Sequence, residues 1–253
     1  MNVIILNAGS ATRLGELTKH LPKGLLDING KSLVERQIEN FDLENIEKIL
    51  LVVGPNKEKF CLENVNYVFD EKYDEHEQLG SLFVAKDFMK DDVIISFGDV
   101  LVEKKVFKQI SNSSFDIGLA VDLNWEKNYI GRTMHPQSEA DLVRIESNLI
   151  TKIQKKLIQN NIEKIGEFLG IIKLNEEGAR IFLEIYTKLL KTCEGKFQTA
   201  DSFNKAFVTD FIQELIDRNV SIHPILINGN WLEIDTSQDL DNARKRIKEW
   251  DID

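Results

Sequence analysis

Small residues and a cation follow the first apolar run of the chain and could form an anion-binding loop. Segment 5–14 passes from Ile5-Leu6 through small residues to Arg13, and Pro22-Lys23 adds a second cation ten residues later. Small side chains let backbone N–H groups approach a phosphate or a flat base, and arginine offers phosphate a planar, permanently charged donor. The segment therefore predicts a polyphosphate-binding loop. An ordinary turn with a surface arginine is the alternative, because the spacing is neither GxGxxG nor a Walker loop.

A carboxylate follows another apolar run, in Phe97-Gly98-Asp99-Val100. A residue at this point lies over the carboxyl edge of a parallel sheet, where open α/β sheets bind their ligands. Asp99 could hold a metal ion there, or it could be a turn residue that caps the next helix. The chain has no GxSxG, no HExxH and no convincing Cys–His pair, so hydrolytic and thiol chemistry have little support.

The elements that would position these residues can be read from apolar runs and helix caps. Segments Val3–Leu6, Ile49–Val53 and Val93–Phe97 are short continuous apolar runs, typical of parallel strands covered on both faces. Ser32 to Glu35 forms a capping box for a helix that runs to Phe41, and Ser81 precedes a second apolar helical segment. Strands that alternate with helices predict a doubly wound sheet.

The second half of the chain follows a different pattern. Residues 142–153 form two alternating segments around the polar tip 146–148, which predicts a β hairpin. Amphipathic helices are expected at about 176–190 and 200–218, followed by a strand pair at 222–227 and 231–234. Thr236 to Asp239 caps a final helix. Without a linker, we expect one domain over 1–253, with a nucleotide-binding half (1–125), an acceptor-binding half (126–235) and a C-terminal helix (236–253).

Composition limits the possible partners. A net charge of −10 argues against nucleic acid and anionic membranes, which need a dense basic face, so small molecules are the expected ligands. The first apolar run is too short for a signal sequence or a membrane span, and the distant Cys61 and Cys193 fit a reducing compartment. We expect a cytoplasmic protein that is a monomer or a homodimer.

The spacing of the first loop resembles a known signature. Leu6-Asn7-Ala8-Gly9-Ser10-Ala11-Thr12-Arg13-Leu14 with Pro22-Lys23 is similar to the LAAGxGTRL and PK elements of the nucleotidyltransferases that activate sugar phosphates and phosphocholine. Asn7 and Ala11 depart from the usual pattern, which puts the choice of base in doubt. The segment Trp231-Leu232-Glu233-Ile234-Asp235-Thr236 resembles the late W-x-(E/D)-I-D-T motif of the same family. The resemblance covers about residues 2–246.

This resemblance implies a Rossmann-like, doubly wound mixed sheet of the nucleotide-diphospho-sugar transferase type, with a β insertion and a helical acceptor side. It implies that Arg13 and Lys23 are catalytic and that Asp99 and Asp235 hold Mg²⁺, an ion that prefers oxygen ligands. Gln78 and Gly80 fall where the family closes its pocket over the base; for Ser81, a loop and a helix cap is the alternative. The nucleotide-binding residues are then Leu6, Asn7, Ala8, Gly9, Ser10, Ala11, Thr12, Arg13, Gln78, Gly80 and Ser81.

The acceptor side has weaker signals. Lys156 corresponds to a family lysine for the acceptor's phosphate, with Lys155 or a solvated strand as alternatives. Arg132, in Tyr129-Ile130-Gly131-Arg132, resembles an acceptor-binding arginine of small cytidylyltransferases, and Glu167 begins a matching glycine-containing strand. Asp210 is a candidate for an amine only by its position, as are Asp201 and Trp231. His135 is expected to be a loop residue outside the site.

These elements resemble cytidylyltransferases for phosphocholine, aminoethylphosphonate or phosphoglutamine, and the chain lacks the hexapeptide repeats of bifunctional relatives. The implied reaction is Mg²⁺-assisted transfer of a cytidylyl group from CTP to a phosphorylated or phosphonate acceptor, with release of pyrophosphate. A uridylyl- or thymidylyltransferase for a sugar 1-phosphate is the alternative. A nucleotide-binding regulator without catalysis is a third possibility, which the intact charged residues argue against.

Overall fold

The computed structural model describes residues 1–9, 12–41, 45–157 and 164–250. Its centre is a nine-stranded mixed sheet in which β1 (Asn2–Asn7) lies between β4 (Lys48–Val53) and β6 (Val93–Phe97). All three run parallel, and β5 (Asn66–Phe69) extends the sheet beyond β4. The three predicted parallel strands are confirmed, as is the fold class.

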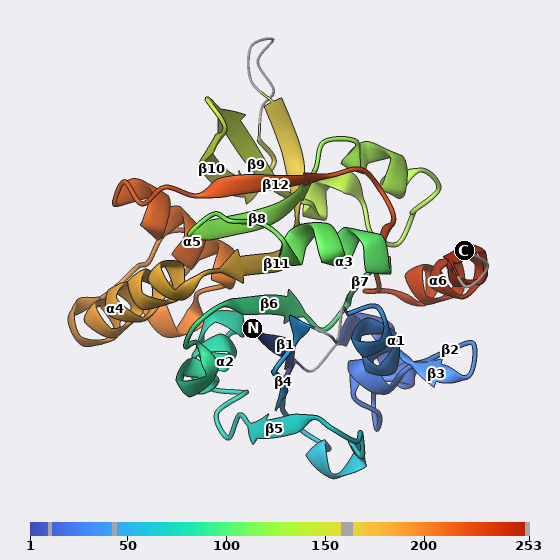
Figure 1. Ribbon diagram of the computed structural model, residues 1–253. Coiled ribbons are helices and arrows are strands. Elements are labelled where there is room, and N and C mark those ends of the chain that lie inside the picture. The colour runs from blue at the N-terminus through green and yellow to red at the C-terminus, as the bar shows by residue number, and fades with distance from the viewer. Residues whose placement is uncertain (10–11, 42–44, 158–163, 251–253) are drawn as a thin grey trace.

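Helices cover both faces of this sheet, which explains why its strands are apolar throughout (Figure 1). On one face Ile4 and Leu6 pack with α2 (Gln78–Val84), α4 (Glu176–Thr192) and α5 (Val208–Asp217). On the other face Val3 and Ile5 pack with α1 (Leu33–Glu39) and α3 (Lys104–Ser111). Because neighbouring residues of a strand point to opposite faces, a strand between two helical layers needs an apolar residue at every position.

The second half of the chain adds antiparallel strands to the same sheet. The long strand β11 (Lys164–Leu174) pairs with β6, with β8 (Ile117–Asp122) and with β9 (Asp141–Glu146). The predicted hairpin is confirmed: β9 pairs antiparallel with β10 (Leu149–Lys155). Its two turn residues, Ser147 and Asn148, have φ of 48° and 63°, the left-handed conformation that tight hairpin turns require.

Two predicted helix starts are wrong. Ser81 lies inside α2 instead of capping a later helix, and its hydroxyl donates to Asp70 Oδ2 at 2.7 Å. Helix α5 begins at Val208. The start of the expected helix, at Ala200, instead forms an isolated antiparallel bridge with Phe197. The capping box of α1 is confirmed, with Ser32 accepting from Glu35 N and the Glu35 carboxylate accepting from Ser32 N.

The last two strands were expected to pair with each other, and this prediction is wrong. Strand β12 (His223–Ile227) pairs parallel with β8, whereas β13 (Trp231–Glu233) pairs antiparallel with β7 (Val100–Val102). A second small ribbon joins β2 (Asp27–Ile28) to β3 (Lys31–Ser32). The pairing of β13 with β7 matters most, because it brings the late WLEIDT segment beside the end of β6.

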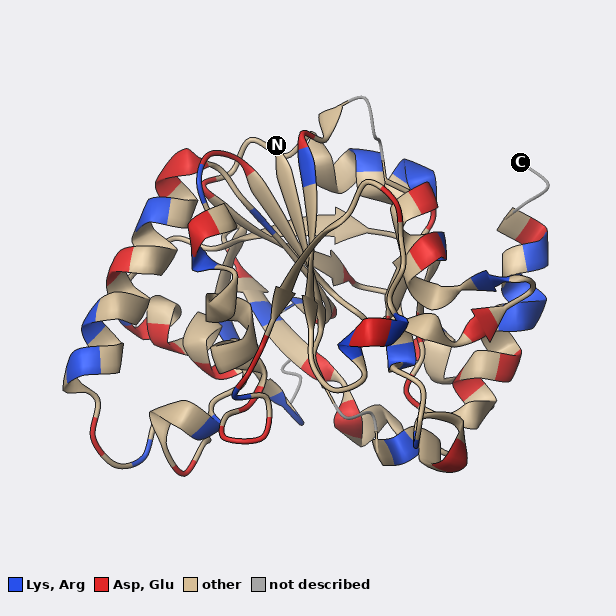
Figure 2. Ribbon diagram, turned by 90° about the horizontal axis from the view of Figure 1, so that it is seen from below, with Lys and Arg blue, Asp and Glu red and all other residues tan. Residues whose placement is uncertain are grey.

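The C-terminal helix α6 (Ser237–Trp250) begins with the expected cap. Asp239 Oδ2 accepts from Thr236 N at 2.9 Å, and Asp239 N donates to Thr236 Oγ1 at 3.3 Å. Figure 2 shows acidic and basic residues interspersed along the helices around largely uncharged strands. Within the described residues, no helix combines the length and the apolar character that crossing a bilayer requires.

Candidate active site

Lys23 lies between two carboxylates from distant parts of the chain. Its Nζ is 2.9 Å from Asp99 Oδ2 and 2.6 Å from Asp235 Oδ1. Asp99 follows β6, Asp235 follows β13, and Ile234 N donates to Asp99 O at 2.9 Å, which fixes the two segments side by side. Arg13 Nη2 adds a contact of 3.0 Å to Asp235 Oδ2. The structure therefore brings together the four charged residues that the sequence placed at one centre.

Charge pairing outweighs burial at this centre. Burial by itself would lower the pKa of Lys23, but Asp99 and Asp235 together raise it above its usual value. Burial would raise the pKa of Asp235, but His135, Lys23 and Arg13 hold it well below its usual range. Asp99 does not cap the next helix, because Glu103 takes that position in α3. Lys23 and Asp235 are thus held in their charged forms.

A first cavity of about 440 Å³ opens beside this centre and contains most of the predicted nucleotide-binding residues. Within the described residues, those that line it are Leu6, Asn7, Ala8, Gly9, Thr12, Arg13, Gln78 and Ser81, joined by Lys23, Tyr73, His76, Glu77, Phe97, Gly98, Asp99, Phe207 and Asp235. Gly80 is absent from the lining, because it faces the His76 ring, which a Cβ there would meet at 2.3 Å. Ser10 and Ala11 lie outside the described residues.

Asn7, one of the two departures from the family signature, has a clear structural role. It is buried, and its Oδ1 accepts from Gly24 N at 3.1 Å, which ties the first loop to the turn that carries Lys23. Its Nδ2 has no hydrogen-bond partner within the described chain. An amide donor is thus left unpaired on a residue that lines the first cavity.

Substitutions at two glycines of this cavity should affect different properties, the stability of the fold at one and ligand binding at the other. An alanine Cβ at Gly98 would lie 2.4 Å from Leu6 O, so we expect Gly98→Ala to destabilise the fold by about 1–3 kcal/mol. At Gly9 nothing lies within 4 Å, so Gly9→Ala should leave stability unchanged. It should nevertheless raise the KM for a nucleotide about tenfold, because the methyl group keeps phosphate from the backbone. Urea unfolding and initial rates measure the two effects; equal stability of both variants would contradict this assignment.

A second cavity of about 650 Å³ adjoins the first and shares Arg13, Gln78, Phe97, Asp99, Phe207 and Asp235 with it. The rest of its lining is mostly polar and consists of His135, Glu139, Asp141, Lys152, Ile153, Gln154, Lys155, Gln198, Thr199, Thr209, Asp210, Gln213 and Glu233. Asp210 is the one predicted acceptor residue in this lining. Its carboxylate accepts from Thr199 Oγ1 at 2.5 Å and from Phe207 N at 2.9 Å, so it also shapes the cavity wall.

The structure selects Lys155 instead of Lys156 for the second cavity. Strand β10 ends at Lys155, whose Nζ is 2.8 Å from Glu139 Oε2 in the cavity wall. Lys156 has a φ of 59°, which turns the chain away, and it is absent from the lining. A register shift between Ile150 and Lys152 breaks the simple alternation along this strand. The preference for Lys156 is therefore corrected to the register alternative.

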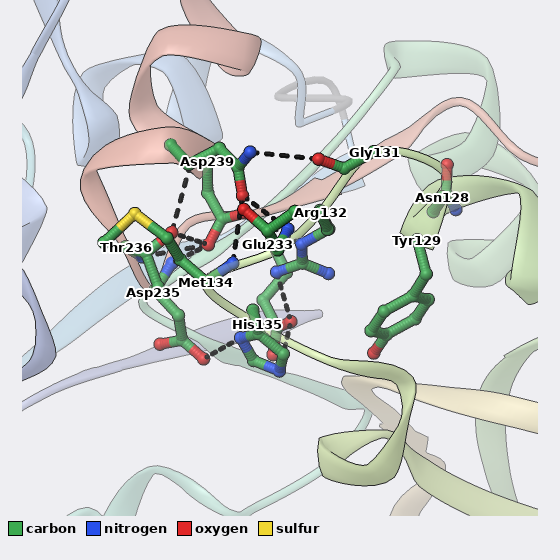
Figure 3. Close-up of polar contacts among 12 residues, drawn as sticks. Asn128, Tyr129, Gly131, Arg132, Met134, His135, Glu233, Asp235, Thr236 and Asp239 are labelled. Carbon is green, nitrogen blue, oxygen red and sulfur yellow. Dashed lines mark hydrogen bonds and ion pairs between the residues drawn. The ribbon is translucent and has the colours of Figure 1, made fainter.

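Arg132 and Glu167 lie beside the second cavity and do not line it. Arg132 Nε donates to Asp239 Oδ1 at 2.7 Å and Nη2 to Glu233 Oε2 at 3.2 Å (Figure 3). Glu167 accepts from the Tyr129 hydroxyl at 2.5 Å, and burial raises the pKa of the Glu167 carboxyl. Neither side chain therefore reaches the space where an acceptor would lie. Arg132 supports the end of β13 and the start of α6, on either side of Asp235, whereas Glu167 bonds Tyr129 and leaves its Oε2 unpaired within the described residues.

His135 and Glu233 were missed as members of the site. His135 is buried, with Nδ1 at 3.3 Å from Asp235 Oδ2 and Nε2 at 3.7 Å from Glu233 Oε2 (Figure 3). Burial, with Asp235 and Asp99, raises the pKa of Glu233 to about 7. Glu233 could have been found, since residues two apart in a strand share a face. Nothing near His135 in the sequence indicates that its loop folds over Asp235.

Two groups of side chains could hold a metal ion, and they share Asp235. The carboxylates of Asp99 and Asp235 lie close together, with Lys23 Nζ between them at 2.9 and 2.6 Å, so they form one candidate pair of ligands. On its other side, His135, Glu233 and Asp235 offer ligand atoms that all lie within 4.8 Å of one another. The first group consists of oxygens alone, the donors that a hard divalent cation prefers.

Comparison with known proteins agrees with this geometry. Residues 3–121 match the model of the MobA-like NTP transferase domain. The chain is 28% identical over 255 residues to the CTP:phosphoglutamine cytidylyltransferase of Campylobacter jejuni subsp. jejuni, covering 95% of this chain and 98% of that protein. It is 30% identical to the bifunctional protein GlmU of Methanococcus maripaludis over 98% of this chain, and it spans about half (54%) of that relative's length.

The fold has a close match among solved structures. The CTP:phosphocholine cytidylyltransferase of Streptococcus pneumoniae superposes with a TM-score of 0.72, at 20% identity, over 97% of this chain and 98% of that one. At this identity the match establishes the shared fold, a mixed sheet flanked by helices.

Proposed function

We propose that the chain, whose residues 3–121 match the MobA-like NTP transferase domain, is a nucleotidyltransferase that transfers a cytidylyl group from CTP to a small phosphorylated acceptor. One observation carries the proposal: Arg13, Asp99 and Asp235 stand at the wall that two adjoining cavities share, and Lys23, which lines the first cavity, bonds both of these carboxylates. One cavity has room for a nucleoside triphosphate and the other for its acceptor. Relatives that use CTP with phosphoglutamine or phosphocholine support this choice of substrates.

The reaction needs positioning and charge more than proton transfer. A phosphate oxygen of the acceptor attacks the α-phosphorus of CTP, one new P–O bond forms, and the bond to the bridging β-phosphate oxygen breaks to release pyrophosphate. The attacking oxygen is already ionised at pH 7, so no general base is required. Arg13 and Lys23 neutralise the negative charge that develops on the phosphates and hold the reacting groups in line.

We assign Asp99 and Asp235 as the residues that would hold Mg²⁺. Their carboxylates lie close together on either side of Lys23 Nζ, and the set of oxygen donors fits a hard divalent ion. When bound, such an ion would supply positive charge to the phosphate oxygens. Asp235 remains ionised at neutral pH because His135, Lys23 and Arg13 hold its pKa low.

The two halves of the chain divide the substrates in this proposal. The nucleotide contacts come from residues 1–125, chiefly the loop around Gly9 and the start of α2. The acceptor contacts come from residues 126–235, where Lys152 and Lys155 are the cations available for its phosphate. Asp210 remains part of the acceptor wall.

Asp141 favours an acceptor that carries a positive charge. This half-buried carboxylate lines the second cavity among Asp210, Glu139 and Asp235, and burial with these charges raises its pKa to about 6 despite Lys155. A carboxylate crowded by others is stabilised by a positive charge on the ligand. An acceptor that bears an ammonium group supplies that charge, with N–H donors for an oxygen-rich wall.

Asp141→Asn is expected to raise the KM for an ammonium-bearing acceptor about tenfold, because it removes a charge-assisted hydrogen bond. The KM for CTP should not change. In the wild type the acceptor KM should rise as the pH falls below about 6, since Asp141 becomes protonated there, and the variant should lack this dependence. Initial rates from pH 5 to pH 8 measure both. Asp116→Asn, an exposed carboxylate outside both cavities, is the control.

A substrate panel tests the function itself. CTP, UTP and dTTP are each combined with glutamine phosphate, phosphocholine, aminoethylphosphonate and glucose 1-phosphate in the presence of Mg²⁺, and pyrophosphate release is measured. The proposal expects turnover with CTP and one of the first three acceptors. Turnover with UTP or dTTP and glucose 1-phosphate alone would replace it with the sugar-activating alternative, and nucleotide binding without any turnover would indicate a regulator.

A further inference from the structure

We infer that a third cavity, which lies apart from the first and shares Glu233 with the second, binds a small anion that carries a phosphate group. It measures about 300 Å³ and lies between the turn Trp125–Tyr129, strand β13 and helix α6. Its lining contains the cations Lys127, Arg132, Lys245 and Arg246 and the amides of Asn128 and Asn242, with Ile130, Trp231, Leu232, Glu233 and Asp239. The first cavity shares no residue with this lining.

The charge of this cavity is opposite to that of the protein. Four cations line it against two carboxylates, Glu233 and Asp239, in a chain whose net charge is −10. Both carboxylates are already bonded to Arg132. Among the described residues, no carboxylate lies within ion-pair distance of Lys127, Lys245 or Arg246. Three unpaired cations therefore surround one small space.

Arg246 is the strongest sign that the cavity is built for an anion. It is half-buried, and its one described hydrogen bond is from Nη1 to Asn128 Oδ1 at 3.3 Å. Burial lowers the pKa of Arg246, and the more distant Glu249 and Glu103 offset this only in part. A guanidinium that has lost water without gaining a carboxylate is stabilised by an anion, and its planar fork suits phosphate.

The other lining residues indicate the chemical class of the ligand, which is a phosphate group attached to a small molecule. Amide groups of Asn128 and Asn242 can donate to phosphate oxygens, while Ile130, Trp231 and Leu232 offer apolar surface to whatever bears the phosphate. The volume is at the lower end for small-molecule sites. Inorganic pyrophosphate and a phosphomonoester share this chemistry, and the experiment below distinguishes them.

An anion in the third cavity can affect the active centre indirectly, because Arg132 contacts both. The guanidinium of Arg132 bonds Asp239, whose Oδ2 accepts from the backbone N–H groups of Asp235 and Thr236 at 3.2 and 2.9 Å (Figure 3). It also bonds Glu233, the last residue of β13, which stands two positions before Asp235. A ligand that attracts Arg132 thus alters the support of Asp235, and we expect it to change turnover as well as to bind.

Tryptophan fluorescence tests this inference, because Trp231 lines the cavity and Trp125 lies in its bounding turn. The protein is saturated with CTP, without acceptor or divalent cation, so that the first cavity is filled. It is then titrated separately with inorganic phosphate, pyrophosphate and glycerol phosphate. We compare the wild type with Lys245→Gln/Arg246→Gln and with Lys248→Gln, an exposed lysine of α6 outside the cavity lining. Circular dichroism and the unfolding midpoint check that both variants fold.

The wild type and Lys248→Gln should show a saturable change with at least one probe, and the double variant should bind that probe at least about tenfold more weakly. Preference for pyrophosphate would identify an inorganic ligand, and preference for glycerol phosphate an organic ester. The inference is overturned if none of the probes changes the fluorescence, or if the folded double variant gives the same titration curve as the wild type.

Discussion

Replacing Asp99 with asparagine is expected to lower the rate of pyrophosphate release about 100- to 1000-fold, the typical effect of losing one charge-stabilising group in an active site. Asparagine keeps the size of the side chain and removes its charge. Asp99 then no longer contributes to a divalent cation site with Asp235, and Lys23 loses one of its two carboxylate partners. The affinity for CTP without metal should change much less than the rate, because Asp99 is one of many residues that line the first cavity.

The fold should tolerate this substitution, since the Asp99 side chain is 27% exposed and Lys23 keeps its contact of 2.6 Å with Asp235. Circular dichroism and the unfolding midpoint verify this. Asp201→Asn, a change of the same kind at an exposed residue outside both cavities, is the matched control and should leave the rate unchanged. Normal turnover of Asp99→Asn would show that the assignment of the metal ligands is wrong.

Lys23→Met is expected to abolish measurable turnover and to lower the free energy of unfolding by about 3 kcal/mol at pH 7, because the buried carboxylate of Asp235 loses its shortest ion pair and keeps Arg13 and His135 as partners. The Asp235 side chain is 6% exposed, and Lys23 itself is 12% exposed. Methionine fills most of the space, so the loss comes mainly from charge and not from a cavity. Equilibrium unfolding in urea measures the change.

The pH dependence of this loss follows from the two shifted groups. The low pKa of Asp235 contributes stability that is present above the usual carboxyl value of 3.8 and is lost as the pH falls through the folded value. The raised pKa of Lys23 contributes stability that is present below 10.5 and is lost as the pH rises through the folded value. The difference between wild type and Lys23→Met should therefore be largest between these limits and shrink in strong acid.

Divalent cations provide the control for Lys23→Met. With the ammonium group gone, Asp99 and Asp235 still face one cation position, so Mg²⁺ should raise the unfolding midpoint of the variant more than that of the wild type. Lys19→Met, at an exposed lysine in the same part of the chain, should respond like the wild type. A variant as stable as the wild type across the pH range would mean that Lys23 is not coupled to the two carboxylates.

The sheet was largely predictable because its signals are local. A strand covered on both faces must be apolar at every position, so β1, β4 and β6 were evident in the sequence, and Ser147 and Asn148 marked the hairpin turn. Helix starts were less reliable, because they depend on partners elsewhere. Ser81 looked like a cap, yet its hydroxyl bonds Asp70, and α2 begins earlier.

Some residues of the active centre could likewise be predicted from local motifs, and others could not. Arg13, Lys23, Asp99 and Asp235 could be proposed from the sequence, since each stands in a short motif of recognisable spacing beside a strand end. Lys155 and Lys156 could not be separated, because a bulge in β10 and the φ of Lys156 decide which side chain enters the cavity. The choice depends on backbone geometry that the residue types leave open.

Residue types and their spacing were enough to predict the parallel core, the loop around Gly9 and the four charged residues of the centre, because apolar periodicity and short motifs reflect contacts within a few residues. The folded arrangement was needed to show that Lys23 lies between Asp99 and Asp235, that His135 is buried against Asp235, and that Arg132 bonds Asp239 beside the site. These contacts join segments 76 to 212 residues apart for Lys23 alone. The pairing of β13 with β7 creates the centre, and no local pattern specifies which strands pair.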